Sequence, residues 1–143
     1  MANSDLLVAS QKFDKVLREI KSRYPEVNWY PYGSLGNFYH LAPLFEVYSL
    51  QDLAPSKRVA DIGGADGDLA FFLSSLGFAV DALEWPPTNM NALEGFKTLA
   101  RALNSDVSLS ITDIDTTLEL PHSDYECIFF SGFCTTLRTR YLS

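Results

Sequence analysis

Basic residues, cysteine and long apolar runs are scarce in this 143-residue sequence, and each shortage excludes a class of protein. Eleven Lys and Arg against 18 Asp and Glu leave a formal charge of −7, which disfavours binding nucleic acid by phosphate contacts alone. The two cysteines, Cys127 and Cys134, match neither a disulfide framework nor paired zinc ligands, so we expect a reducing cytoplasm and no metal site. No apolar run approaches the roughly 20 residues of a membrane helix, and the N-terminus lacks the features of a secretion signal.

Apolar residues make up 47% of the sequence and aromatic residues 13%, which is enough to bury the core of one modest domain. Between Asp5 and Tyr24 the apolar side chains recur at steps of three and four among charged residues. This spacing predicts an amphipathic helix that ends at Pro25.

An irregular segment follows this helix. Residues 29–50 interleave aromatic residues with Gly and Pro, so we expect a structured loop and then a short helix near Leu41–Tyr48. We therefore assign residues 1–54 to an N-terminal helical leader and residues 55–143 to the main α/β domain.

From residue 58 onward, strand and helix patterns alternate. Apolar runs that are suited to burial on both faces predict a parallel sheet sandwiched by helices, which is the α/β class. Gly77 marks the end of the first helix of this domain, and Asn89 is a candidate cap for the second, whose apolar face carries Leu93 and Phe96. The predicted strands are Arg58–Ile62, Phe78–Trp85, Val107–Thr112 and Tyr125–Phe130.

The segment VADIGGADGDLA, from Val59 to Ala70, contains the end of the first predicted strand and a group of small residues directly after it. In an open α/β sheet ligands bind at this carboxyl edge, and small residues let the backbone approach a ligand. The N–H groups that open the next helix can donate to an anionic group. The dinucleotide fingerprint GxGxxG fails because Asp68 stands at its third glycine. The alternative is a tight strand-to-helix turn without a ligand.

Two acids lie at the ends of the next two strands. Glu84 ends the second strand, 23 residues after Asp61, where a nucleotide-binding sheet places the carboxylate that binds ribose hydroxyls. A carboxylate only accepts hydrogen bonds and can accept from both hydroxyls. Asp113 follows the third strand and precedes Ile114, and its alternative role is that of an exposed turn residue.

The glycine turn, read as Asp61, Gly63, Ala65 and Gly67, is similar to the DxGxGxG turn of class I S-adenosylmethionine (SAM) methyltransferases, with Ala65 in place of the middle glycine. Residues 29–130 resemble a bacterial group of these enzymes in three motifs. The motifs are Trp29-Tyr30-Pro31-Tyr32, the turn and helix from Asp61 to Gly77, and Val80-Asp81 through Pro86-Pro87-Thr88-Asn89 to Asn91.

This resemblance implies a partial Rossmann-like sheet of strand order 3-2-1-4, SAM as cofactor, and a leader that covers the cofactor site. It places the glycine turn at the methionine end of SAM, where Ala65 would narrow the space, Glu84 at the ribose and Asp113 at the adenine amino group. The implied cofactor-binding residues are Asp61, Gly63, Gly64, Ala65, Gly67, Glu84, Trp85, Asp113 and Ile114.

The methyl acceptor is not identified by these residues. The resemblance implies a nucleophilic N, O or C atom on a small molecule or an RNA, and a more distant similarity is to enzymes that modify the wobble uridine of tRNA, which the net charge disfavours. No catalytic residue is assigned. His40 is either a general base or packed among aromatic residues, and Tyr30, Tyr32 and Tyr39 either line the acceptor site or pack the leader onto the sheet.

The resembled sheet has seven strands, whereas this sequence supplies four before Ser143. Back-translated in a shifted frame, residues 130–143 read FGLLYHLENPLFI, similar to the FFLGxLYHLxNP of the resembled group. We hypothesise that residues 131–143 are out of frame and that the methyltransferase is truncated. Its catalytic activity is then expected to be lost or strongly reduced. The exposed fourth strand is expected to cause self-association. The alternatives are a naturally short chain that dimerises through that strand and a non-enzymatic nucleotide-binding or interaction module.

Overall fold

The computed structural model describes residues 3–33, 35, 57–116, 119–125 and 127–130. The predicted helix near Leu41–Tyr48, His40, Tyr39 and the tail after Phe130 lie outside these residues. Among the described helices, none combines the length and apolar character needed to cross a bilayer. The elements are helix α1 (Asn3–Ser22), strand β1 (Arg58–Ile62), helix α4 (Asp68–Ser75), strand β2 (Ala79–Glu84), the short 3-10 helix η3 (Pro86–Thr88), helix α5 (Glu94–Leu103), strand β3 (Ser108–Ile111) and strand β4 (Cys127–Phe130).

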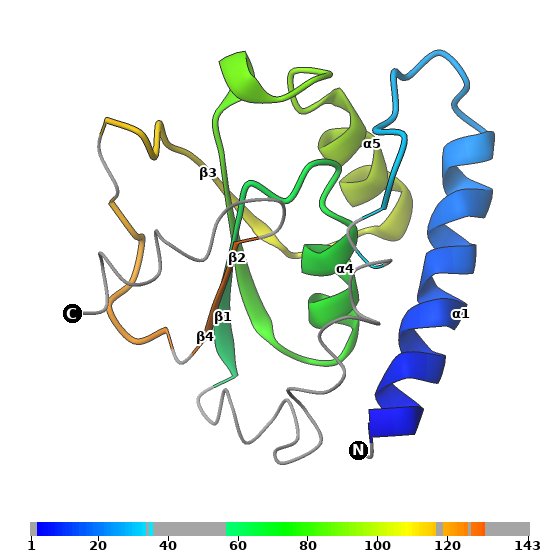
Figure 1. The fold of residues 1–143 in the computed structure, drawn as a ribbon, viewed down its shortest axis with the longest axis horizontal. Coiled ribbons are helices and arrows are strands. Elements are labelled where there is room, and N and C mark those ends of the chain that lie inside the picture. The colour runs from blue at the N-terminus through cyan, green and yellow to red at the C-terminus, as the bar shows by residue number, and fades with distance from the viewer. Residues whose placement is uncertain (1–2, 34, 36–56, 117–118, 126, 131–143) are drawn as a thin grey trace.

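The four described strands form one parallel sheet of order β3-β2-β1-β4, so the predicted α/β class and strand order are confirmed. Helices α4 and α5 lie on one face of this sheet, and α1 runs alongside them (Figure 1). The prediction of strands buried on both faces is wrong for β3, where Ser108 and Ile111 are exposed. The reason is that β3 lies at an edge of the described sheet and pairs only with β2.

The main apolar core lies between the sheet and the three helices. Leu17 of α1, Leu73 of α4 and Leu99 of α5 are fully buried in it, together with Val59 of β1. Burial of each such side chain stabilises the fold by about 1.5–3 kcal/mol. This confirms the predicted amphipathic leader helix, whose buried side packs on α4 and α5.

The predicted end of α4 agrees with the structure, whereas the predicted start of the next helix does not. Gly77 has φ 97° and ends α4 with hydrogen bonds from its own N–H to the Ser74 carbonyl and from Phe78 N–H to the Leu73 carbonyl, as predicted. The prediction that Asn89 caps the next helix is wrong, because α5 begins at Glu94. Two consecutive left-handed residues, at 92 and 93, break any helix that would start at Asn89.

The opposite face of the sheet carries a smaller apolar cluster around Ala60, Ile62 and Leu83. Asp81 is buried on β2, where the Tyr125 hydroxyl donates a hydrogen bond to its carboxylate. Burial and this carboxylate raise the pKa of Tyr125. Three side chains between β3 and β4 therefore pack onto this face, namely Ile114, Leu120 and Tyr125.

Candidate functional site

The glycine turn leaves β1 at the carboxyl edge of the sheet with alternating left-handed residues. Gly63, Ala65 and Gly67 have φ values of 67°, 57° and 88°. The Gly63 N–H donates to the carbonyl of Leu83 on β2, at 3.1 Å, and the Gly67 N–H donates to the Gly64 carbonyl at 2.8 Å. A Cβ at Gly67 would lie 2.6 Å from the Phe96 ring, so both conformation and packing require glycine there.

Ala65 is the position at which the sequence departs from the resembled turn. Its φ of 57° lies in the left-handed region, which costs an alanine roughly 1–2 kcal/mol. The turn therefore keeps a conformation suited to glycine although it carries a methyl group. The Ala65 carbonyl accepts a hydrogen bond from the Asn89 side chain at 3.2 Å, which ties the turn to the link that follows β2.

Two buried acids lie beneath this turn. Asp61 is 1% exposed and Glu84 is 6% exposed. Burial, and then the charge of Asp61, raise the pKa of Glu84 to about 7. Interaction with the Gly64 N–H and with the Asn89 side chain acts to lower the pKa of the Glu84 carboxyl. A Cβ at Gly64 would collide with the Asp61 carboxylate, so the second glycine of the turn is required by close approach.

Glu84 is therefore a hydrogen-bond acceptor that changes charge near neutral pH, held against the backbone of the turn. This arrangement suits a ligand that donates hydrogen bonds, such as a ribose diol. Trp85, the next residue, is half-buried and extended, with φ −124°, and its carbonyl accepts a hydrogen bond from the Thr88 N–H at 3.1 Å.

Asp113 lies beyond β3 at the same edge of the sheet. The preceding residue, Thr112, donates its N–H to the Glu84 carbonyl at 2.9 Å. The Asp113 carboxylate accepts the Asp115 N–H at 3.1 Å, so it holds a turn, which is the alternative role that the sequence left open. The Ile114 side chain packs on the opposite face of the sheet. An adenine contact for Asp113 and Ile114 stays a prediction.

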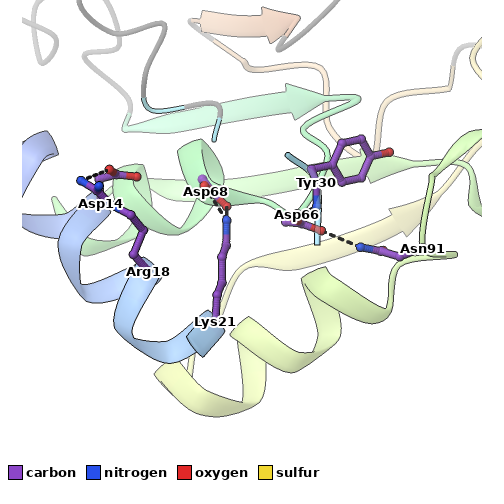
Figure 2. Close-up of polar contacts among 7 residues, drawn as sticks. All are labelled: Asp14, Arg18, Lys21, Tyr30, Asp66, Asp68 and Asn91. Atoms are coloured by element: carbon purple, nitrogen blue, oxygen red, sulfur yellow. Dashed lines mark hydrogen bonds and ion pairs between the residues drawn. The ribbon is translucent and has the colours of Figure 1, made fainter. Parts of the chain in front are cut away.

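Asp66 and Asn91 join the leader to this site, and we did not predict that pairing from the sequence. Asp66 is 2% exposed and accepts hydrogen bonds from the Tyr30 N–H at 3.0 Å and from the Asn91 side chain at 2.8 Å (Figure 2). Asn91 also donates to the backbone carbonyl of Asn28 at 3.0 Å. Both residues stand in the motifs that carry the resemblance, but neither motif alone indicates the contact, because the pair spans 25 residues.

A buried ion pair makes the second connection between the leader and the domain. Lys21 on α1 lies 3.0 Å from the Asp68 carboxylate at the start of α4, with side chains 15% and 2% exposed (Figure 2). Burial raises the pKa of Asp68 and outweighs the lowering effect of Lys21. The Lys21 ammonium also lies 5.6 Å from the centre of the Trp29 ring.

The tyrosines of the leader motif divide between packing and exposure. The Tyr30 hydroxyl accepts the Met90 N–H at 2.8 Å, so this side chain bridges the leader and the link after β2. Its ring lies 5.9 Å from that of Tyr32, which is 62% exposed. Tyr30 is therefore a leader residue whose side chain contacts the link after β2.

The described geometry thus brings most of the predicted residues to one edge of the sheet. Asp61 and Glu84 both lie beside the glycine turn, Asp113 is adjacent through β3, and the leader reaches the turn through Asp66. Comparison with protein-family models, with curated proteins and with solved structures found no match for this chain. The interpretation of the site therefore depends on its own residues.

Proposed function

We propose that this chain binds SAM at the carboxyl edge of the sheet and belongs to the class I methyltransferases, acting on a small-molecule acceptor. The observation that carries the proposal is the burial of Glu84 at the end of β2, next to the turn after β1, where the Gly63 N–H donates to the Leu83 carbonyl at 3.1 Å. In open α/β sheets this is the position at which an acid binds the ribose of a nucleoside ligand.

The charge of the site favours SAM over a dinucleotide. Asp61, Asp66 and Glu84 are all buried around the turn, and residues 59–96 contain neither Lys nor Arg. SAM carries a positive sulfonium, a positive ammonium and a negative carboxylate group, so it is a net cation, whereas the pyrophosphate of NAD is negatively charged. An anionic environment attracts the first ligand and repels the second.

Each residue has a defined task in the proposed site. Glu84 accepts hydrogen bonds from the ribose hydroxyls, and the glycine turn lies against the methionine end of the ligand. Asp113 lies at the next strand, where the adenine would extend. SAM supplies an electrophilic methyl group, and the protein holds this group in line with the acceptor.

The distribution of basic residues also supports a small acceptor over an RNA. Residues 24–56 contain neither Lys nor Arg, so neither the leader beyond α1 nor the turn offers a positive charge to a phosphate backbone. Phosphate contacts supply most of the affinity of proteins for nucleic acids. A neutral or cationic small molecule is the acceptor class that this surface admits.

Calorimetric titration of the full chain with SAM and, separately, with NAD tests the proposal. We expect SAM to bind and NAD not to bind. Glu84→Ala should weaken SAM binding by about 1–3 kcal/mol, the scale of lost hydrogen bonds to a charged group. Glu94→Ala on the exposed side of α5 is the matched control and should bind as the wild type does. Binding of neither ligand would favour an interaction module, and unchanged affinity in Glu84→Ala would remove Glu84 from the site.

A further inference from the structure

We propose that Tyr30, Asp66 and Asn91 form a leader clamp that positions both walls of the SAM site, so that docking of the leader and binding of the cofactor stabilise each other. This inference rests on the proposed function. It assigns a role to three residues that do not themselves need to touch the reacting atoms, and they are therefore positioning residues.

The clamp contacts the two walls of the site separately. Asp66 lies within the glycine turn, between Ala65 and Gly67, and accepts the Tyr30 N–H at 3.0 Å. The Tyr30 hydroxyl accepts the N–H of Met90, in the link after β2, at 2.8 Å. One leader residue thus binds the wall formed by the turn through its backbone and the wall formed by the link through its side chain.

Asn91 completes the connection with all of its side-chain hydrogen-bonding groups. Its amide group donates to the Asp66 carboxylate at 2.8 Å and to the Asn28 carbonyl at 3.0 Å, and its oxygen accepts the Gly95 N–H at 3.2 Å. An aspartate of the same shape could not donate to either partner. The contacts of Asn91 with Asp66 and Asn28 therefore require an amide group and not only a side chain of this size.

Gly95 shows how closely these groups are packed. A Cβ at this position would collide with the Asp66 carboxylate and would lie 2.8 Å from the Asn91 side-chain nitrogen. Asp66 is buried, so an acceptor that loses its donors there cannot turn to water. Breaking one contact of the clamp is thus expected to displace its neighbours.

The position of Glu84 explains why the clamp would act on cofactor binding. Glu84 lies between the turn and the link, which are the same two walls that the clamp joins, and the Asn89 side chain of the link donates to the Ala65 carbonyl of the turn at 3.2 Å. Burial, together with the charges of Glu84 and Asp66, raises the pKa of the Tyr30 hydroxyl. A ligand that fixes the two walls also fixes the anchors of the leader, and by linkage the docked leader favours the ligand equally.

Hydrogen exchange of the Tyr30 amide in the full chain reports the clamp directly, because that N–H donates to Asp66. In the wild type, saturating SAM should slow Tyr30 exchange at least about fivefold, the lower end of typical coupling between two sites. Asp66→Asn and Asn91→Ala should each weaken SAM binding at least about fivefold and abolish this SAM-dependent slowing. Asn28→Ala is the matched control, because only the backbone carbonyl of Asn28 enters the clamp, and it should behave as the wild type does.

The outcomes separate this inference from the proposed function. If the wild type binds SAM but Tyr30 exchange is unchanged by SAM, and both variants bind SAM within about twofold of the wild type, the clamp is only structural and the inference is overturned. If the wild type does not bind SAM at all, both proposals are wrong. Where one variant does not fold, the other variant and the wild-type exchange measurement still decide.

Discussion

Replacing Glu84 with glutamine should change how the stability of the fold depends on pH. Glu84 is 6% exposed, and burial and then the charge of Asp61 raise its pKa from 4.5 to about 7. The folded state therefore holds a proton that the unfolded chain has already released between these two pH values. Because the folded state binds more protons there, its free energy of unfolding falls as the pH rises through this window.

The size of the effect follows from the difference between the two pKa values. Each pH unit between them corresponds to about 1.36 kcal/mol, so the contribution of Glu84 is largest below pH 4.5, amounts to about 3 kcal/mol, and is lost above pH 7. About 2.5 kcal/mol of this change falls between pH 5 and pH 8. Glutamine resembles the protonated acid and stays neutral, so the variant lacks this loss.

Urea denaturation at pH 5 and pH 8, followed by tryptophan fluorescence, measures the effect. The stability of Glu84→Gln relative to the wild type should rise by about 2.5 kcal/mol from the lower to the higher pH. The raised pKa of Asp68 acts in the same direction, but it is present in both proteins and cancels in the comparison. Glu94→Gln, at an exposed position, should show no such change. If the free energies of unfolding of Glu84→Gln and the wild type change in parallel with pH, the folded state does not hold a proton on Glu84 in this range.

Backbone strain, a buried ion pair and ionisation of the ligand site support three more predictions. Ala65→Gly should stabilise the fold by about 0.5–1 kcal/mol, because relief of a left-handed alanine outweighs the freedom that glycine adds to the unfolded chain. Thermal denaturation should show a higher Tm for Ala65→Gly, and a similar gain for Ala92→Gly, because Ala92 has φ 53°. A lower Tm in both variants would mean that the left-handed alanines do not strain the backbone. Lys21→Met should cost about 3–5 kcal/mol in urea denaturation, because a buried carboxylate on α4 loses its cation. Arg18→Met, from an exposed pair on α1, should cost under about 1 kcal/mol, and equal losses would argue against burial as the cause. SAM affinity measured by calorimetry should rise about tenfold from pH 6 to pH 8 as Glu84 ionises, whereas a flat profile would mean that SAM does not need the carboxylate.

The regular elements were predictable because their signals are local. The first strand, Arg58–Ile62, was predicted with its observed bounds, since an apolar run followed directly by glycine marks both of its ends. The leader helix and the Gly77 helix end follow from spacing and from a single left-handed position. The parallel sheet was predicted from the alternation of strand and helix patterns, whereas the strand order came from the family resemblance, and the described strands agree with both.

The features that were missed depend either on partners far away along the chain or on left-handed residues that are not glycine. The carboxylate of Asp68 meets Lys21 across 47 residues, a separation that no local pattern reports. Asn89 does accept backbone hydrogen bonds as a capping residue would. However, its side-chain oxygen accepts the N–H groups of Asn91 and Leu93 in a turn that precedes the helix. The two left-handed residues after this turn delay the start of α5, and neither of them is a glycine that would have indicated it.

The glycine in the first turn of α5 has a consequence for how this sequence can change over evolution. Gly95 costs the helix about 1 kcal/mol relative to alanine, and the space for a methyl group is occupied by the Asp66 carboxylate. Substitution to alanine is blocked only while an aspartate stands at 66 and its partner asparagine at 91. In an alignment of relatives these three positions should therefore covary, with larger residues appearing at 95 only in lineages that have lost the acid at 66.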